Sequence, residues 1–148
     1  MVKRARDSQA KGGTLGPRHK ARRTAVQALY QWDITEQSAD VIRDHFIETE
    51  GSKGVDTTYL AMLISEVPQY CDELEEALTP FLDRTFISLD PIERAILRIG
   101  SYELLYQLEV PPKVVINEAI ELAKVFGAEH SFRYVNGVLD KLAASSRG

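Results

Sequence analysis

Apolar side chains recur every three or four residues along most of the chain, which is the spacing of a helix face. The first segment with this spacing contains Ala25, Val26, Leu29, Tyr30 and Ile34. It predicts an amphipathic helix over about 17–33, with Pro17 in the first turn, where its missing backbone N–H costs nothing. Further helices are predicted over about 38–48, 56–68, 72–78, 90–108, 113–126 and 129–144.

The predicted helix ends carry residues with suitable capping chemistry. Asp56 and Asp90 can each cap the helix that follows. Pro91 suits the first helical position, and Glu93 can reach back to complete a capping box. Gly127 is placed to close a helix in the left-handed conformation.

These patterns predict an all-α fold of about seven helices. The short apolar run 114–116 is the one stretch that resembles a strand, and its flanks are helical. An apolar connector over 81–89 divides a more polar first half from a more apolar second half. We therefore expect two packed helical subdomains, at about 18–79 and 80–144. Residues 1–17 hold several glycines and charges with few apolar side chains, and are expected to form a disordered basic arm.

Charge is distributed unevenly between the start of the chain and the rest. The net charge is −4, but residues 1–23 contain eight Lys or Arg against one Asp, which is 8 − 1 = +7. The remaining residues therefore carry −4 − 7 = −11. A basic arm on an acidic body suits a polyphosphate partner. The competing interpretation is a disordered tail that only keeps the protein soluble.

Composition excludes several other function classes. The single cysteine, Cys71, and three distant histidines make a zinc site improbable, and the chain has neither a glycine-rich phosphate loop nor an HExxH motif. We expect no enzyme activity and no cofactor. No apolar run approaches the roughly 20 residues that cross a bilayer, and the basic N-terminus lacks the apolar core of a signal peptide. A cytoplasmic protein is expected, without membrane contact.

Three motifs resemble those of the NusB family of transcription antitermination factors. RRTAVQALY at 22–30 resembles the family's opening helix, and DPIERAILRIGSYEL at 90–104 resembles its central helix. The stretch VPPKVVINEAIELAKVFGAEHSFRYVNGVLDKLA at 110–143 resembles its C-terminal signature. Together the resemblance covers about 18–144.

The resemblance implies both a fold and a function. It implies two helical subdomains that bind the boxA element of nascent RNA together with NusE, a ribosomal protein. The pair helps the RNA polymerase antitermination complex read through terminators, notably in ribosomal RNA operons. A NusB-like domain also precedes some RNA cytosine methyltransferases, but this chain ends before a methyl-donor-binding domain and that variant is not expected.

The resemblance places RNA-binding residues at the start of the first helix. These are Arg18, His19, Lys20, Arg22 and Arg23. Cations at this density suit backbone phosphates, whose contacts release counterions. His19 and Lys20 stand where the family has an arginine run, so bidentate phosphate contacts are reduced there.

A second RNA-binding group is implied near Gly127. Phe126, His130 and Tyr134 recur every four residues beside Lys124, and flat side chains can stack unpaired bases. The competing interpretation is that Phe126 and Tyr134 pack between the last two helices. His130 stands where the family often has an acid, so its contact with RNA is open and would depend on pH.

Further contacts are implied on the central helix and on the first. Arg98 and Phe81 are expected to face RNA, and Glu93 is expected at the joint edge of RNA and NusE. The alternatives are that Glu93 is only a cap, that Arg98 only pairs with Glu103 or Glu129, and that Phe81 is core.

Tyr30 and Ile34 lie beyond the basic start of the first helix and are expected to bind NusE. The alternative is burial in the N-terminal core. The whole prediction requires the cationic helix and the aromatic side chains near Gly127 to face one groove. The rival function is a helical protein-interaction or ribosome-assembly adaptor with only loose RNA binding.

Overall fold

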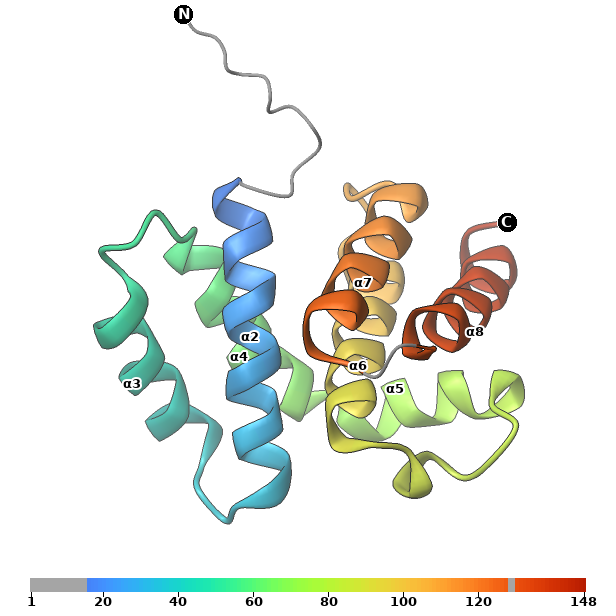
Figure 1. Cartoon of the computed structure of the whole chain (residues 1–148), viewed down its shortest axis with the longest axis horizontal. Coiled ribbons are helices and arrows are strands. Elements are labelled where there is room, and N and C mark those ends of the chain that lie inside the picture. Colours follow the sequence, from blue (N-terminus) through green and yellow to red (C-terminus); the bar gives the residue numbers. More distant parts are fainter. Residues whose placement is uncertain (1–15, 128–129) are drawn as a thin grey trace, which may run out of the picture. The chain divides into compact units, whose positions relative to one another are not determined.

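The computed structural model of the chain describes residues 16–127 and 130–148 (Figure 1). Across these residues the regular structure is entirely helical, with seven α-helices and two short 3-10 helices. The α-helices are α2 (Pro17–Ile34), α3 (Ala39–Glu50), α4 (Thr57–Gln69), α5 (Cys71–Leu78), α6 (Pro91–Tyr106), α7 (Pro112–Phe126) and α8 (Ser131–Arg147). The 3-10 helices are η2 (Thr79–Phe81) and η3 (Phe86–Ser88). The predicted all-α fold is confirmed, whereas the expected basic arm lies almost wholly outside the described residues.

The chain divides into two compact units, with the division between Pro68 and Gln69. The expected boundary near residues 79–80 falls later than this division. The reason is that α5 packs against α6 and η2, and therefore belongs to the second unit rather than the first. None of the described helices is both long enough and apolar enough to cross a membrane.

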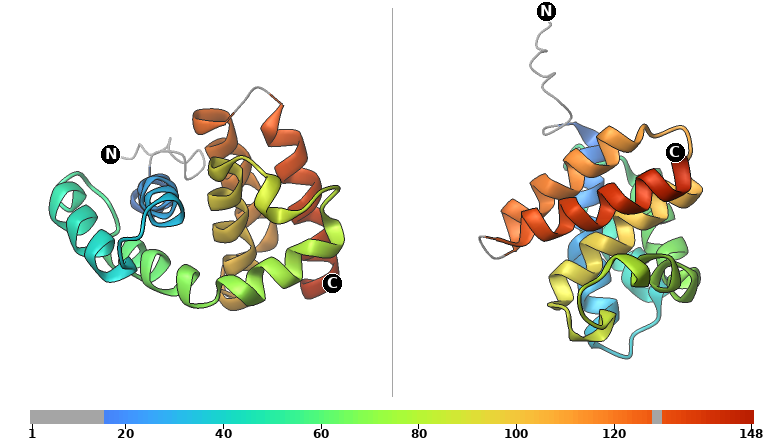
Figure 2. Two further views of the ribbon diagram at one scale, coloured as in Figure 1. Left: turned by 90° about the horizontal axis from the view of Figure 1, so that it is seen from below. Right: turned by 90° about the vertical axis from the view of Figure 1, so that its right-hand side faces the viewer.

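The first unit is built from α2, α3 and α4. Helix α2 packs against α3, and Figure 2 shows α2 end-on between α3 and α4. Arg43 of α3 donates a 3.0 Å hydrogen bond to Ser65 of α4. The Asp56 side chain accepts from the Tyr59 N–H at 3.0 Å, as its predicted capping role requires. The fully buried apolar side chains of the first unit are Ala21, Ala25, Val26, Ala28, Leu29, Ile42, Leu60, Leu63, Ile64 and Val67.

The second unit is centred on α6, which packs against α5, α7 and α8. Residues 94–104 of α6 are all buried, so this helix is the core of the unit. Asp90 accepts from the Ile92 N–H at 2.7 Å and Pro91 begins the helix, as predicted. The Arg94 guanidinium donates to the carbonyls of Ile87 and Leu89, at 2.9 and 2.6 Å, and so fastens η3 onto α6.

Two predicted details of the second unit are wrong. Glu93 does not close a capping box, because its carboxylate accepts a 2.6 Å hydrogen bond from Ser131 of α8. Gly127 is not left-handed, because its φ of −96° and ψ of −179° are those of extended backbone. Its lack of a side chain serves close packing instead: a Cβ there would lie 2.8 Å from the Ala123 carbonyl oxygen and 3.0 Å from Ser131 Cβ.

Candidate nucleic-acid interface

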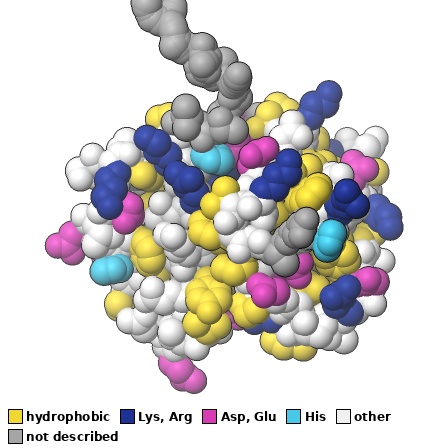
Figure 3. Space-filling model, viewed as in Figure 1, with side chains coloured by type: hydrophobic (Ala, Val, Ile, Leu, Met, Phe, Trp, Pro, Cys, Tyr) yellow, Lys and Arg dark blue, Asp and Glu magenta, His cyan; other side chains and the backbone are white. Residues whose placement is uncertain are grey.

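Four basic residues, Arg18, Lys20, Arg22 and Arg23, lie in the first two turns of α2, and Figure 3 shows several Lys and Arg side chains on the face of the molecule seen in Figure 1. Arg18 is exposed, and its guanidinium carbon lies 4.1 Å from the centre of the Tyr59 ring. The same guanidinium has its Nε 4.0 Å from Asp56 Oδ2. Because Asp56 also caps α4 and its N–H donates to the Pro17 carbonyl at 3.1 Å, the start of α2 is tied to the start of α4.

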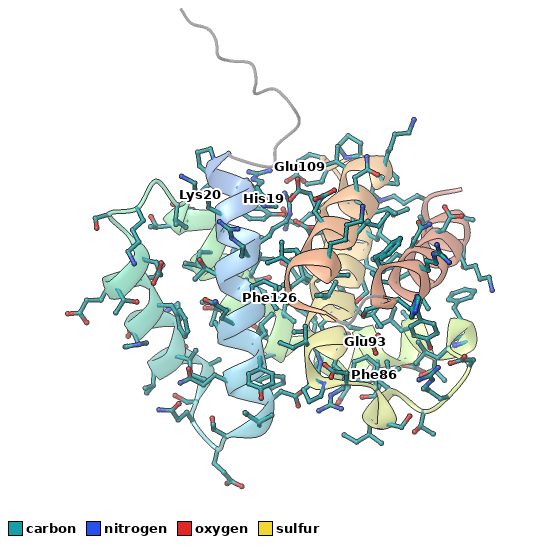
Figure 4. The ribbon with its side chains drawn as sticks, viewed as in Figure 1. His19, Lys20, Phe86, Glu93, Glu109 and Phe126 are labelled. Carbon is teal, nitrogen blue, oxygen red and sulfur yellow. The ribbon has the colours of Figure 1, made fainter. Side chains whose placement is uncertain are left out.

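The other predicted residues on α2 differ in how accessible they are. Arg23 is exposed and Lys20 is half-buried, so the Arg23 guanidinium and the Lys20 ammonium can both reach a ligand. His19 and Arg22 are buried, and Arg22 is only 3% exposed with its guanidinium 5.4 Å from the Tyr59 ring centre. Figure 4 shows His19 and Lys20 projecting from different sides of α2.

Tyr30 and Ile34 lie at the other end of α2, and the structure leaves both of them exposed. Tyr30 is 36% exposed and Ile34 is 52% exposed, so burial in the N-terminal core does not account for them. Exposed apolar side chains one helical turn apart can anchor a partner protein. Their role in binding NusE stays a prediction.

In the second unit, the aromatic side chains predicted near Gly127 lie at the junction of α7 and α8. Phe126 ends α7 and is half-buried, as labelled in Figure 4, while His130 is exposed just before α8. Tyr134 is half-buried in the second turn of α8. Lys124 is exposed, and its ammonium lies 5.1 Å from the centre of the Phe132 ring.

Tyr134 packs against the loop that follows η2, which neither of the sequence-based interpretations anticipated. Its hydroxyl oxygen accepts a 3.3 Å hydrogen bond from the Asp83 backbone N–H. The Arg84 guanidinium carbon lies 5.2 Å from the centre of the Tyr134 ring. Burial raises the pKa of the Tyr134 hydroxyl, which therefore stays protonated at neutral pH.

Asp83 and Arg84 form an ion pair in this loop. Arg84 Nε lies 2.8 Å from Asp83 Oδ1, and Nη2 lies 3.3 Å from Oδ2. Hydrogen bonding from Arg84 lowers the pKa of the Asp83 carboxyl, and the hydrogen bond to Asp83 raises the pKa of Arg84. Both groups are charged at any pH near neutrality.

Phe132, Arg133 and Arg84 were not among the predicted binding residues. Phe132 is half-buried, and the cationic groups of Lys124 and Arg133 lie over its ring. The Arg133 guanidinium carbon is 5.6 Å from the ring centre. Alternation of basic and aromatic residues over 132–134 was a usable signal for this cluster, whereas no local signal marks Arg84.

The predicted residues on and before α6 are more enclosed. Arg98 is 8% exposed, and its guanidinium carbon lies 4.9 Å from the centre of the Phe86 ring. Glu93 is half-buried and, as described, bonded to Ser131; Figure 4 shows it in the first turn of α6. Phe81 is half-buried at the end of η2. Glu129, a suggested partner of Arg98, lies outside the described residues.

Two further observations concern metal-ligating and nucleophilic side chains. Over residues 16–127 and 130–148, no three His, Cys, Asp or Glu side chains gather in a way that could hold a metal ion. Burial, followed by the charge of Asp72, raises the pKa of the Cys71 thiol, which disfavours a thiolate nucleophile. The basic and aromatic side chains described above are of the kinds that bind a polyanion such as RNA.

The chain matches known proteins over most of its length. The family model described as "NusB family" matches residues 19–144. Transcription antitermination protein NusB of Pasteurella multocida is 52% identical over 129 residues, which are 87% of this chain and 90% of the relative. The protein of the same name from Nitrosococcus oceani is 54% identical over 130 residues, covering 88% of this chain and 87% of the relative.

Two solved structures are similar to this one. T. maritima NusB is 28% identical with a TM-score of 0.78, covering 89% of this chain and 94% of that chain. The antitermination factors NusB and NusE in complex with dsRNA include a chain that is 26% identical with a TM-score of 0.78, covering 86% of this chain and 96% of that one. The family match, the two relatives and the shared helical fold agree: this chain belongs to the NusB family.

Proposed function

We propose that this protein is an RNA-binding transcription antitermination factor that recognises boxA RNA together with NusE. It acts in the RNA polymerase antitermination complex, promotes read-through of ribosomal RNA operons, and works in the cytoplasm as a binding protein without enzyme activity. Membership of the NusB family is the observation that carries this proposal, since relatives about half identical to this chain are named antitermination proteins. A structural relative has been solved with NusE and double-stranded RNA.

The chemistry of each unit supports RNA as the ligand. The first unit presents Arg18, Lys20 and Arg23 at the start of α2, where cations can replace the counterions of a phosphate backbone. The second unit presents Phe126 and the Lys124–Phe132 pair, which combine flat surfaces with positive charge. We propose that each of these two groups contacts RNA.

Exposed apolar side chains on α2 support the proposed binding of NusE. Tyr30 and Ile34 offer a protein partner an aromatic and an aliphatic anchor one turn apart. NusE docking at these residues leaves the basic first turns of α2 available to RNA. We propose that Glu93, whose carboxylate accepts a hydrogen bond from Ser131, contacts both RNA and NusE.

A titration with and without NusE tests the proposal. Labelled single-stranded boxA RNA, a scrambled oligonucleotide and a boxA-containing duplex are each titrated with the protein, alone and with NusE of the same organism. We expect boxA to bind at least about tenfold more tightly than the scrambled strand, a difference of about 1.4 kcal/mol. NusE should increase that preference, and the duplex arm decides which form of RNA is bound.

The alternative function gives a different result in the same titration. An adaptor for protein interaction or ribosome assembly, with only loose RNA binding, would bind boxA and scrambled RNA equally. Its affinity would depend on salt alone, because contacts to phosphates do not distinguish sequences. Equal binding in the presence of NusE would reject boxA recognition in favour of this adaptor.

A further inference from the structure

We propose that Arg84 is a further RNA-binding residue, and that Asp83 weakens RNA binding by competing with phosphate for the Arg84 guanidinium. The inference rests on the proposed RNA-binding function, and it concerns two neighbouring residues that no family resemblance assigned. In the loop after η2, the Asp83 backbone N–H donates to the Tyr134 hydroxyl and the Arg84 guanidinium lies over the Tyr134 ring.

The Arg84 guanidinium lies over the Tyr134 ring and is open to solvent. The guanidinium carbon lies 5.2 Å from the Tyr134 ring centre, and the ring is anchored to the loop by the 3.3 Å hydrogen bond from the Asp83 N–H to the Tyr134 hydroxyl. The Arg84 side chain is nevertheless 53% exposed. A planar guanidinium has five N–H donors, and the pair with Asp83 engages two of its nitrogens. The other guanidinium donors make no hydrogen bond to the residues that the structure describes, and they can bind phosphate oxygens.

Asp83 opposes this binding in two ways. Its carboxylate oxygens, 2.8 and 3.3 Å from Nε and Nη2, occupy the edge of the guanidinium that matches a phosphate bidentately. Its negative charge also cancels the charge that would attract RNA. Because the Asp83 side chain is 62% exposed, the ion pair is weak and exchanges readily with a phosphate.

A double-mutant cycle tests both parts of the proposal. Wild type, Asp83→Asn, Arg84→Ala and the double variant are titrated with labelled single-stranded boxA RNA and scrambled RNA across a series of KCl concentrations. Asp83→Asn should tighten binding about threefold to fivefold. Arg84→Ala should weaken it by at least a similar factor and reduce the dependence of log affinity on log salt by about one. In the Arg84→Ala background, Asp83→Asn should have no effect, because Asp83 acts through Arg84.

The chain offers a matched control for the change of net charge. Asp44 is also exposed and pairs with the neighbouring Arg43, at 3.0 Å, in α3 of the other unit. Asp44→Asn therefore makes the same charge change without altering the loop, at an arginine that keeps a second ion pair with Asp40, and RNA affinity should be unchanged. Arg84→Lys keeps the charge but loses the guanidinium beside the Tyr134 ring, and should bind with intermediate affinity. Thermal unfolding of each variant establishes that the fold is intact.

Several outcomes would overturn the inference. Unchanged affinity of Arg84→Ala would remove Arg84 from the RNA-binding residues. Equal tightening by Asp83→Asn in both backgrounds, or by Asp44→Asn, would reduce the effect of Asp83 to general electrostatics. These results would not contradict the proposed function, provided that wild type still binds boxA more tightly than scrambled RNA. A wild-type protein that binds neither RNA would reject the function itself and this inference with it.

Discussion

The hydroxyl of Ser131 donates a 2.6 Å hydrogen bond to Glu93 Oε2, which joins the first residue of α8 to the first turn of α6. The contact is between residues 38 positions apart, and Ser131 is buried. It gives Glu93 a structural role in the second unit beside the RNA and NusE contact proposed for it.

Ser131→Ala should therefore destabilise the second unit. Loss of a hydrogen bond to a charged group costs about 1.5–3 kcal/mol, and the remaining carboxylate is left partly desolvated. Urea denaturation followed by circular dichroism measures the change. Ser145→Ala, at an exposed position of the same helix, is the control and should change stability by less than about 0.5 kcal/mol. Equal effects at the two positions would contradict the role of the bond.

Substitutions at two glycines should change stability in opposite directions. Gly127→Ala places a Cβ 2.8 Å from the Ala123 carbonyl oxygen and 3.0 Å from Ser131 Cβ, so the backbone must move, at a cost of about 1–3 kcal/mol. Gly137→Ala meets no heavy atom within 4 Å in α8, and should stabilise the protein by about 0.5–1 kcal/mol. Thermal melts show whether each variant is less or more stable than wild type. A stabilised Gly127→Ala would contradict the close packing of Gly127 against Ala123 and Ser131.

Arg22 and Arg23 are neighbours whose substitution should have different effects. Arg23 is exposed, so Arg23→Ala should weaken binding to every RNA sequence and lower the salt dependence by about one, with the fold unaffected. Arg22 is buried over Tyr59, so Arg22→Ala should chiefly lower the free energy of unfolding, by about 1–3 kcal/mol. Salt-dependent RNA titrations and urea denaturation of both variants separate these effects. If Arg22→Ala instead weakened RNA binding without lowering stability, the Arg22 guanidinium would have to become available to RNA.

Phe126→Ala tests base stacking at the end of α7. If the half-buried ring stacks a base, its removal should cost about 1–3 kcal/mol in boxA affinity. Phe126→Tyr keeps a ring and should retain most of the affinity. Circular dichroism must show an intact fold, because lost packing would also weaken binding. Equal affinity of Phe126→Ala and wild type would assign the ring to packing alone.

RNA binding should strengthen as the pH falls from 8 to 5.5 if His130 contacts the ligand. His130 is exposed just before α8, and an imidazolium there would attract phosphate. Asp83 does not contribute to the slope, because hydrogen bonding from Arg84 lowers the pKa of its carboxyl and keeps it charged throughout. Titrations of wild type and His130→Asn at several pH values measure the effect. A slope that survives in His130→Asn would exclude His130 as its source.

Local features of the chain predicted the helices well because each depends on near neighbours. Apolar spacing over 17–33 marked α2, and the Asp90-Pro91 pair marked the start of α6, where Asp90 bonds to an N–H two residues away. The same local logic failed for Glu93 and Gly127. Glu93 bonds to Ser131, 38 positions away. Gly127 has extended backbone where the chain passes close to Ser131 at the start of α8.

The sequence by itself determined that this protein is all-helical, that its cations concentrate at the start, and which residues resemble the NusB family's binding positions. Only the tertiary structure decided which of those cations are accessible, because burial depends on helices packed from elsewhere in the chain. Arg22 is covered while Arg23 is exposed, although the two are adjacent. Arg84 becomes a candidate because Tyr134, 50 positions later, supplies the ring on which its guanidinium rests.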